Sequence, residues 1–221
     1  MRKDLVTAIV AVAALTVLLG VAYPLLTTGV GQVLFSDQAN GSQVERDGRV
    51  VGSSLIGQDF RRPAADPATG RPQVDEEGEP VLEPDPRYFQ PRPSQTGYAA
   101  DASAFSNLGP NGTDTRAAIA ANVEAYLALE GRYDGSLGAD DVPVDAATQS
   151  GSGIDPQISE RNARIQARRI AAVRHLPLER VRQLVSDHTA GRQLGVLGEP
   201  GVNVLELNLA LDQTDRSTSR R

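Results

Sequence analysis

The pattern of apolar and polar positions changes sharply after the first part of the chain. Residues 5–36 contain no Asp, Glu, Lys, Arg or His, and most of residues 5–26 are apolar. A helix needs about 20 apolar residues to cross a bilayer, so the pattern predicts one transmembrane helix over residues 5–27. Pro24 is expected to end or kink this helix near its outer end, with residues 27–31 leaving the membrane interface.

The charges on either side of the apolar segment predict its orientation. Arg2 and Lys3 precede the segment, whereas the first charges after it are Asp37 and Glu45. Because Lys and Arg favour the cytoplasmic side, residues 1–4 are expected in the cytoplasm and the main domain outside. A cleavable signal has a shorter apolar stretch and a small-residue cleavage site. We therefore expect a retained single-pass anchor in the plasma membrane.

The remaining pattern predicts a mixed α/β (α+β) extracytoplasmic domain over residues 37–212. The Asp47-Gly48 dipeptide between short apolar runs predicts a β-hairpin within residues 43–56, because these residues tolerate the positive φ angles of tight hairpin turns. Apolar residues at helical spacing predict three helices, over residues 115–130, 159–175 and 178–188.

Three further segments show other patterns. Leucines alternate with polar residues over 202–212, which predicts a half-buried strand. Residues 61–87 combine many prolines with acidic residues, which predicts an extended or mobile acidic loop. Residues 213–221 contain no apolar side chain and are expected to form a disordered tail.

Composition excludes several kinds of chemistry. The 221-residue chain has a net charge of −6 and no Cys, and Lys3 is its only lysine. Thiol nucleophiles, Schiff-base enzymes and phosphate-loop NTPases are therefore excluded from the outer domain. His175 and His188 are expected at helix ends or on the surface, with no metal site and no catalytic residue. An extracytoplasmic domain without a basic excess also argues against nucleic acid as a partner.

One glycine-rich turn, here called the Ser-Gly-Ser-Gly turn, precedes the helix predicted over 159–175. Its backbone N–H groups and the positive end of that helix could bind an anion such as a phosphate. A plain structural turn is the alternative, and Asp155 would repel an anion nearby. The turn consists of Ser150, Gly151, Ser152 and Gly153.

Arginines recur at helical spacing in the same predicted helix. Arg161, Arg164 and Arg168 are three and four positions apart and should form one basic stripe, while Arg169 and Arg174 are expected elsewhere on the surface. The stripe is either a solvated face or a contact for an acidic partner loop or a nucleotide.

Two neighbouring aromatic residues close the proline-rich segment. Tyr88 and Phe89 stand beside each other in a chain with only nine Phe and Tyr residues, and Arg92 follows them. We expect the pair to dock onto the core of its own domain, with a contact to a partner, including Arg92, as the alternative.

Six blocks of sequence together resemble the C subunit of the Kdp potassium-transporting ATPase over residues 1–212. The proline-rich acidic segment departs from the usual pattern as an insertion. The blocks are Ala-Asn-Gly-Ser at 39–42, Gly-Ser-Ser-Leu-Ile-Gly-Gln at 52–58, Tyr-Phe-Gln-Pro-Arg-Pro-Ser at 88–94, Ser-Asn-Leu-Gly-Pro at 106–110, Ser-Gly-Ser-Gly-Ile-Asp-Pro-Gln-Ile-Ser at 150–159 and Val-Asn-Val-Leu-Glu-Leu-Asn at 202–208.

This resemblance implies an accessory, non-catalytic subunit that holds together a potassium-binding channel-like subunit and a P-type ATP-hydrolysing subunit. It also implies a catalytic chaperone that raises the ATP affinity of the hydrolysing subunit. A nucleotide contact would fall on the Ser-Gly-Ser-Gly turn with Gln166, although an outward-facing domain meets no cytosolic ATP except through the complex. The alternatives are a membrane-anchored module that binds a small extracytoplasmic ligand and, with least support, an anchored hydrolase.

Overall fold

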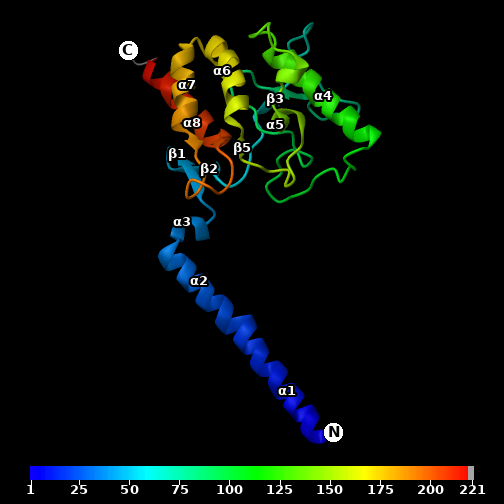
Figure 1. The fold of residues 1–221 in the computed structure, drawn as a ribbon, viewed down its shortest axis with the longest axis vertical. Helices are drawn as coiled ribbons and strands as arrows, with labels where there is room; N and C mark the ends of the chain where they lie inside the picture. The colour runs from blue at the N-terminus through cyan, green and yellow to red at the C-terminus, as the bar shows by residue number, and fades with distance from the viewer. Residues whose placement is uncertain (219–221) are drawn as a thin grey trace. The chain divides into compact units, whose positions relative to one another are not determined.

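The computed structural model describes residues 1–218, with side chains described up to residue 214 (Figure 1). The chain divides into two compact units, Met1–Ser53 and Ser54–Arg221.

The first unit begins with one long helical segment, Arg2–Leu34, which is long and apolar enough to cross a membrane. It consists of α1 (Arg2–Val17), a π-helical turn (Leu18–Ala22) and α2 (Tyr23–Leu34). The helix therefore continues past Pro24 and residue 27 to Leu34, whereas the sequence pattern predicts an end or a kink near Pro24 and an end at residue 27. The wider turn before Pro24 lets the Tyr23 N–H bond to the Leu18 carbonyl, so the proline is accommodated without a break.

A short helix and a hairpin complete the first unit. They are α3 (Ser36–Ala39), β1 (Gln43–Arg46) and β2 (Arg49–Ser53), with the two strands paired antiparallel. The predicted hairpin is confirmed, and Asp47 and Gly48 form its turn with φ angles of 53° and 75°. Positive φ at both turn positions is what a two-residue hairpin turn of matching twist requires.

The second unit is built around a layer of three helices. In Figure 1, α6 (Glu160–Arg174), α7 (Leu178–Asp187) and α8 (Val204–Thr218) pack beside one another. The helices α6 and α7 are confirmed within one residue of their predicted bounds. Their apolar faces enclose the main core, which contains Phe89, Ile158, Ala163, Ile170, Val181, Leu184, Val185, Val202, Leu207 and Leu211.

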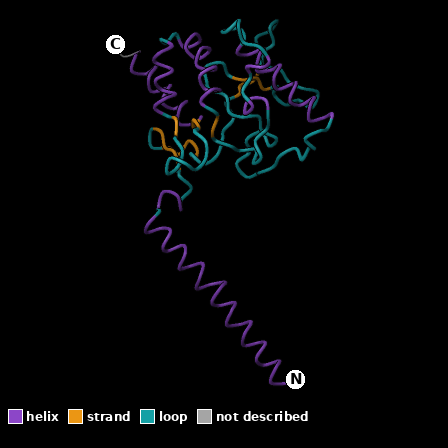
Figure 2. Tube along the Cα trace, viewed as in Figure 1, coloured by secondary structure: helices purple, strands orange, loops and turns teal. Residues whose placement is uncertain are grey.

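A small antiparallel sheet lies beside these helices. Its strand order is β5 (Gln157–Ile158), β7 (Gly201–Asn203) and β6 (Thr189–Ala190). The predicted helix at 115–130 is also confirmed as α4 (Thr113–Glu130), and a 3₁₀ turn (Ala139–Asp141) and α5 (Val144–Ala147) follow it. Figure 2 shows that long irregular segments surround α4, whereas strands are short throughout. The predicted mixture of helices and strands is therefore confirmed.

The prediction of a strand over 202–212 is wrong, because only its first two residues are in β7 and the rest begin α8. The Asn203 side chain accepts a bond of 3.1 Å from the Glu206 N–H and thereby caps the helix. Val204, Leu207 and Leu211 are buried at helical spacing. The helix continues to Thr218, so residues 213–218 do not form a disordered tail, and residues 219–221 lie outside the described part.

The proline-rich segment at 61–87 is folded rather than loose. Its ends pair as the antiparallel strands β3 (Arg61–Pro63) and β4 (Leu82–Pro84). Between these strands, isolated β-bridges join Ala65 to Pro72 and Val74 to Pro80. Two aspartates close the turns, since Asp66 and Asp75 each accept two backbone N–H bonds. Asx turns of this kind need no hydrophobic core, which is why the apolar pattern did not reveal them.

Candidate functional site

Polar groups of the Ser-Gly-Ser-Gly turn form hydrogen bonds that stabilise the conformation of the turn itself. The Ser150 Oγ accepts a bond of 2.8 Å from the Gly153 N–H, and the Ser152 Oγ accepts one of 3.2 Å from the Ile154 N–H. Gly153 has a φ of +76°, and a Cβ there would lie 2.7 Å from the Ala104 carbonyl oxygen. Glycine is therefore required at this position both for conformation and for space.

The same turn binds the irregular segment at 94–104. The Ser152 carbonyl accepts bonds from the Ala104 N–H and the Ser103 hydroxyl, at 3.1 and 3.0 Å. The Gly153 carbonyl accepts one of 2.5 Å from the Ser94 hydroxyl. The turn thus positions a neighbouring loop.

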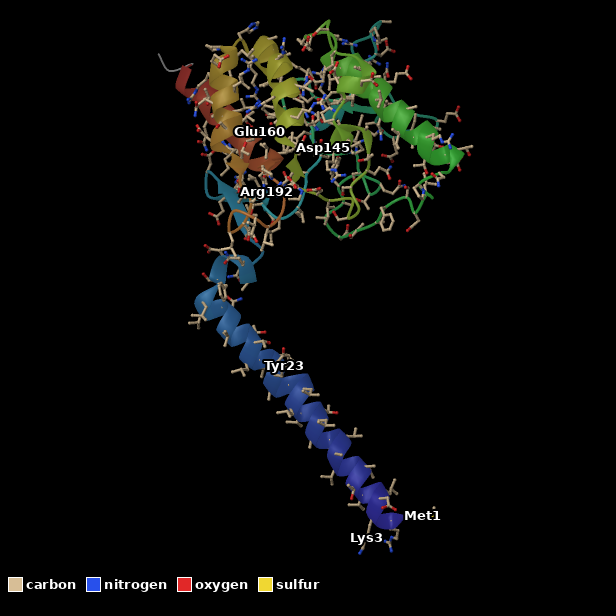
Figure 3. The ribbon with its side chains drawn as sticks, viewed as in Figure 1. Met1, Lys3, Tyr23, Asp145, Glu160 and Arg192 are labelled. Carbon is tan, nitrogen blue, oxygen red and sulfur yellow. The ribbon has the colours of Figure 1, made fainter. Side chains whose placement is uncertain are left out.

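The N-terminus of α6 is occupied by a carboxylate of the chain itself. Six residues, including β5, separate Gly153 from Glu160, the first residue of α6, so the turn does not lie at the helix end. Asp145 accepts bonds from the N–H and hydroxyl of the N-cap Ser159, each at 2.8 Å, and from the Asn162 amide at 3.0 Å. Figure 3 labels Asp145 and Glu160 at this junction. Asp145 takes the place that an anion would occupy at a helix N-terminus.

Gln166 is buried and its amide is fully used. The amide nitrogen donates to the Gln90 carbonyl at 3.0 Å and to the Asn162 Oδ1 at 2.9 Å. The amide oxygen accepts from the Gln90 N–H at 2.7 Å and from Arg169 at 2.9 Å. Gln166 therefore clamps the chain at Gln90, and it lines a different cavity from the one that the Ser-Gly-Ser-Gly turn borders.

Arg169 lies in the interior, not on the surface as expected. Its side chain is 0% exposed and its Nε is 2.9 Å from the Glu130 Oε1, whose side chain is 1% exposed. Nη1 donates to the carbonyls of Pro86 and Tyr88 at 2.6 and 2.9 Å. One arginine thus joins α6, the end of α4 and the segment before Phe89. A buried cation needs this many partners to offset its lost hydration.

Glu130 has one oxygen engaged by Arg169 and a second, Oε2, without a hydrogen-bond partner in the described part of the chain. Burial raises the pKa of the Glu130 carboxyl and outweighs the opposing effect of Arg169. Nearby, the Tyr126 hydroxyl donates to the Asn162 Oδ1 at 2.9 Å, and burial raises the pKa of that phenol. These groups form a polar network inside the domain.

A cavity of about 360 Å³ borders this network. Its size lies at the lower end of the range of small-molecule pockets. Its walls offer amide, phenol and carboxylate groups and no nucleophile paired with a base among the residues described. The polar residues that line it are Arg61, Gln90, Ser94, Tyr98, Asn122, Tyr126, Glu130, Asn162 and Gln166.

The predicted arginine stripe is exposed, and each of its members is paired with an acidic residue of the same domain. Arg164 lies 2.5 Å from Glu160, and Arg168 lies 3.3 Å from Asp134. Arg161 lies 3.8 Å from the Asp141 carboxylate and donates to the Asp141 carbonyl at 2.9 Å. The stripe borders a surface hollow of about 480 Å³ that mixes both signs of charge. Its positive charge is therefore largely balanced from within the domain.

The aromatic pair separates into an inner and an outer residue. Phe89 is fully buried in the core, so its proposed contact with a partner is corrected to a core contact. Tyr88 lies beneath the Arg174 guanidinium, 4.8 Å from its ring centre, and Arg174 is itself held by Asp212 at 2.9 Å. Arg174 is thus mostly buried rather than a surface group.

Arg92 and the two histidines, which the sequence analysis also singled out, have local structural roles. Arg92 is partly buried and bonds to Asp155 at 3.0 Å. His175 adopts the left-handed conformation that ends α6, and His188 ends α7 with its Nδ1 2.8 Å from the Leu184 carbonyl. The helix-end roles predicted for both histidines are confirmed.

Comparison with known proteins places the chain in a family. A family profile described as "KdpC: K+-transporting ATPase, c chain" matches residues 5–213. The chain belongs to the KdpC family. It is 47% identical over 216 residues to the potassium-transporting ATPase KdpC subunit of Mycobacterium tuberculosis, covering 96% of this chain and 100% of that protein. The KdpC subunits of Rhodospirillum rubrum and Sorangium cellulosum are likewise 47% identical, over 97% and 98% of their lengths.

The match includes the apolar helix as well as the second unit, so the family covers both parts of the chain. Sequence reasoning found the family from its six blocks but missed Asp145, Glu130 and the burial of Arg169. No local signal marks Asp145, because it lies in α5, 14 positions before Ser159, to which it bonds. Nothing local in the sequence links Glu130 to Arg169, because 39 positions separate them.

Proposed function

We propose that this chain is the accessory C subunit of a potassium-transporting ATPase complex in the cell membrane. In this proposal the helix Arg2–Leu34 crosses the membrane once, with its N-terminus in the cytoplasm and the second unit outside. The observation that carries the proposal is the family match over residues 5–213, which extends through the membrane helix. Arg2 and Lys3 before the helix support the orientation.

In this role the chain assembles other subunits and performs no chemistry itself. The proposed partners are a potassium-binding channel-like subunit and a P-type subunit that hydrolyses ATP. With Lys3 as its only lysine, the chain cannot contain the Asp-Lys-Thr-Gly-Thr phosphorylation motif of such a pump in its outer domain. The buried network around Arg169 supports a scaffold, because its hydrogen bonds join three separate segments of the second unit.

Assembly is tested by co-purification from membranes. The full chain should purify with both partner subunits, and the complex should show potassium-stimulated ATP hydrolysis. When the chain is omitted, we expect the other subunits to separate and this stimulated hydrolysis to fall. A complex that assembles and turns over normally without the chain would contradict the proposal.

We further propose that the chain acts as a catalytic chaperone, raising the ATP affinity of the hydrolysing subunit. A direct nucleotide contact at the Ser-Gly-Ser-Gly turn is a separate hypothesis with its own test. Gly151 is exposed and a side chain there meets nothing within 4 Å. Gly151→Val therefore crowds the outer surface of the turn while leaving the fold intact, which Gly153→Ala would not do.

Gly135→Val is the matched control, because Gly135 is also exposed with open space around it. Binding of a labelled ATP analogue to the full complex is the measurement. A direct contact predicts weaker binding with Gly151→Val and unchanged binding with Gly135→Val. Equal binding by both variants would reject the direct contact, and only an effect through the partner subunit would remain.

The alternative is a membrane-anchored module that binds a small extracytoplasmic ligand. The cavity of about 360 Å³ beside Glu130 is the observation that favours it. This alternative predicts that the chain, once extracted from the membrane, purifies without the other subunits. The full-length match to KdpC subunits favours the assembly role.

A further inference from the structure

An exposed apolar loop projects between β6 and β7. We call residues 191–200 the apolar finger. Leu194, Val196 and Leu197 at its tip are 90%, 71% and 56% exposed, the greatest such concentration in the second unit as described. Contiguous exposed apolar side chains mark interaction surfaces more often than single ones. Arg192, labelled in Figure 3, lies near the start of this loop.

The finger has a defined shape despite its exposure. Gln193 and Leu197 exchange two backbone hydrogen bonds, of 2.8 and 2.9 Å, across the loop. Below the tip, both oxygens of Glu199 accept bonds from Arg192, at 2.8 and 2.7 Å. Leu194 has a φ of +53°, which is costly for a leucine. The tip is therefore held away from the domain by its own bonds instead of folding back to bury its leucines.

The base of the finger lies beside the first residue of the second unit. Asn203, two residues after Gly201, donates from its side chain to the Ser54 carbonyl at 2.8 Å. Ser54 directly follows the unit that carries the membrane helix, and 20 positions separate it from Leu34, the last residue of that helix. The finger therefore leaves the second unit from a strand that bonds to Ser54, the residue at which the chain enters that unit.

The charge on the finger discriminates between a lipid and a protein as its occupant. Its only charged residues, Arg192 and Glu199, neutralise each other. It has no Lys, Trp or Tyr, the residues that anchor surface segments to anionic or interfacial lipid. A fixed backbone shape with paired charges instead fits a complementary, uncharged recess on a protein.

We propose that the apolar finger inserts its tip into an apolar recess on a membrane-embedded subunit of the potassium-transporting ATPase complex. This inference rests on the proposed function, since it names the surface through which the accessory subunit meets its partner. Leu194 and Leu197 are the anchors. Their exposure in the isolated chain means that the recess, not the domain, buries them.

A photo-crosslinking residue at position 196 of the full chain tests the occupant. In membranes containing the complete complex, irradiation should join position 196 to a protein subunit. The same residue at position 144 is the matched control, because Val144 is 76% exposed on another part of the domain. Products with lipid alone, or equal yields from positions 196 and 144, would overturn the proposal.

The pair Leu194→Ser and Leu197→Ser measures what the tip contributes. We expect the double variant to keep its unfolding midpoint, since both side chains are exposed, and to bind the other subunits at least about tenfold more weakly. Unchanged binding would contradict the proposed role of the finger and leave the assembly role of the chain intact. Failure of the wild-type chain to co-purify would overturn both, so the two results are distinguishable.

Discussion

The two sides of helix α6 carry the same residue type in opposite circumstances. On the outer side, Arg161, Arg164 and Arg168 are well exposed and pair with acids at the surface. On the inner side, Arg169 is completely buried and donates to Glu130, Gln166 and two backbone carbonyls. The sequence suggested a binding role for the outer arginines, whereas the structure shows that the inner arginine makes more of the contacts that join separate segments of the fold.

The difference shows that surroundings, not residue type, decide what an arginine contributes. An exposed pair is weakened by water and salt, and holding two long side chains together costs entropy. Water cannot replace a lost partner of a buried arginine, so the loss of one group leaves the remaining charge buried without compensation. The comparison can be tested by removing one arginine from each side.

Arg169→Met should have the largest effect. The substitution leaves the Glu130 carboxylate and two carbonyls buried without their donor, so we expect the free energy of unfolding to fall by about 3 to 5 kcal/mol. Arg164→Met removes an exposed pair with Glu160 on the same helix and should cost well under about 1 kcal/mol. Denaturation of the full chain in detergent, followed by tyrosine fluorescence, measures both.

A second substitution separates lost charge pairing from lost packing. If the uncompensated Glu130 charge causes the damage, adding Glu130→Gln to Arg169→Met should restore part of the stability. Equal losses for Arg169→Met and Arg164→Met would contradict the distinction between the two sides of α6.

The apolar pattern predicted the helices well because local signals there agreed with burial. In α6 and α7 the apolar residues that recur at helical spacing, Ala163, Ala167, Ile170, Val181 and Val185, are all buried. In α8 two signals conflicted, since leucines at every second position suggest a strand while Val204, Leu207 and Leu211 also fit a helix. The Asn203 cap, with Glu206 three residues later, was the local signal that decided the outcome.

The interior of the candidate site was harder to predict than the fold. The glycines of the Ser-Gly-Ser-Gly turn could be recognised in the sequence, but the segment at 94–104, to which the turn bonds, has no regular pattern of apolar and polar residues. The pairing of Glu130 with Arg169 depends on the tertiary fold, and a charged residue beside apolar ones on a helix is usually exposed. The nucleotide hypothesis therefore rested on atoms that the folded chain uses for itself, as at Gln166.

The pH dependence of stability offers the subtlest test of the inner side of α6. Burial raises the pKa of the Glu130 carboxyl, so the folded chain holds the proton of this carboxyl more tightly than the unfolded chain does. In the unfolded chain a glutamate has its ordinary pKa of about 4.3. The contribution of Glu130 to stability is then greatest below that unfolded-state pKa and is lost as pH rises through the folded-state pKa.

Glu130→Gln isolates this effect, since glutamine has nearly the same shape and does not titrate. The difference in unfolding free energy, wild type minus variant, should increase as the pH is lowered from neutral toward 4, as measured by denaturation at a series of pH values. The other carboxyls titrate alike in both proteins and cancel. A difference that instead decreases at low pH would mean that attraction to Arg169 outweighs the burial of Glu130, and the buried pair would then resemble the exposed pairs in sign and differ only in size.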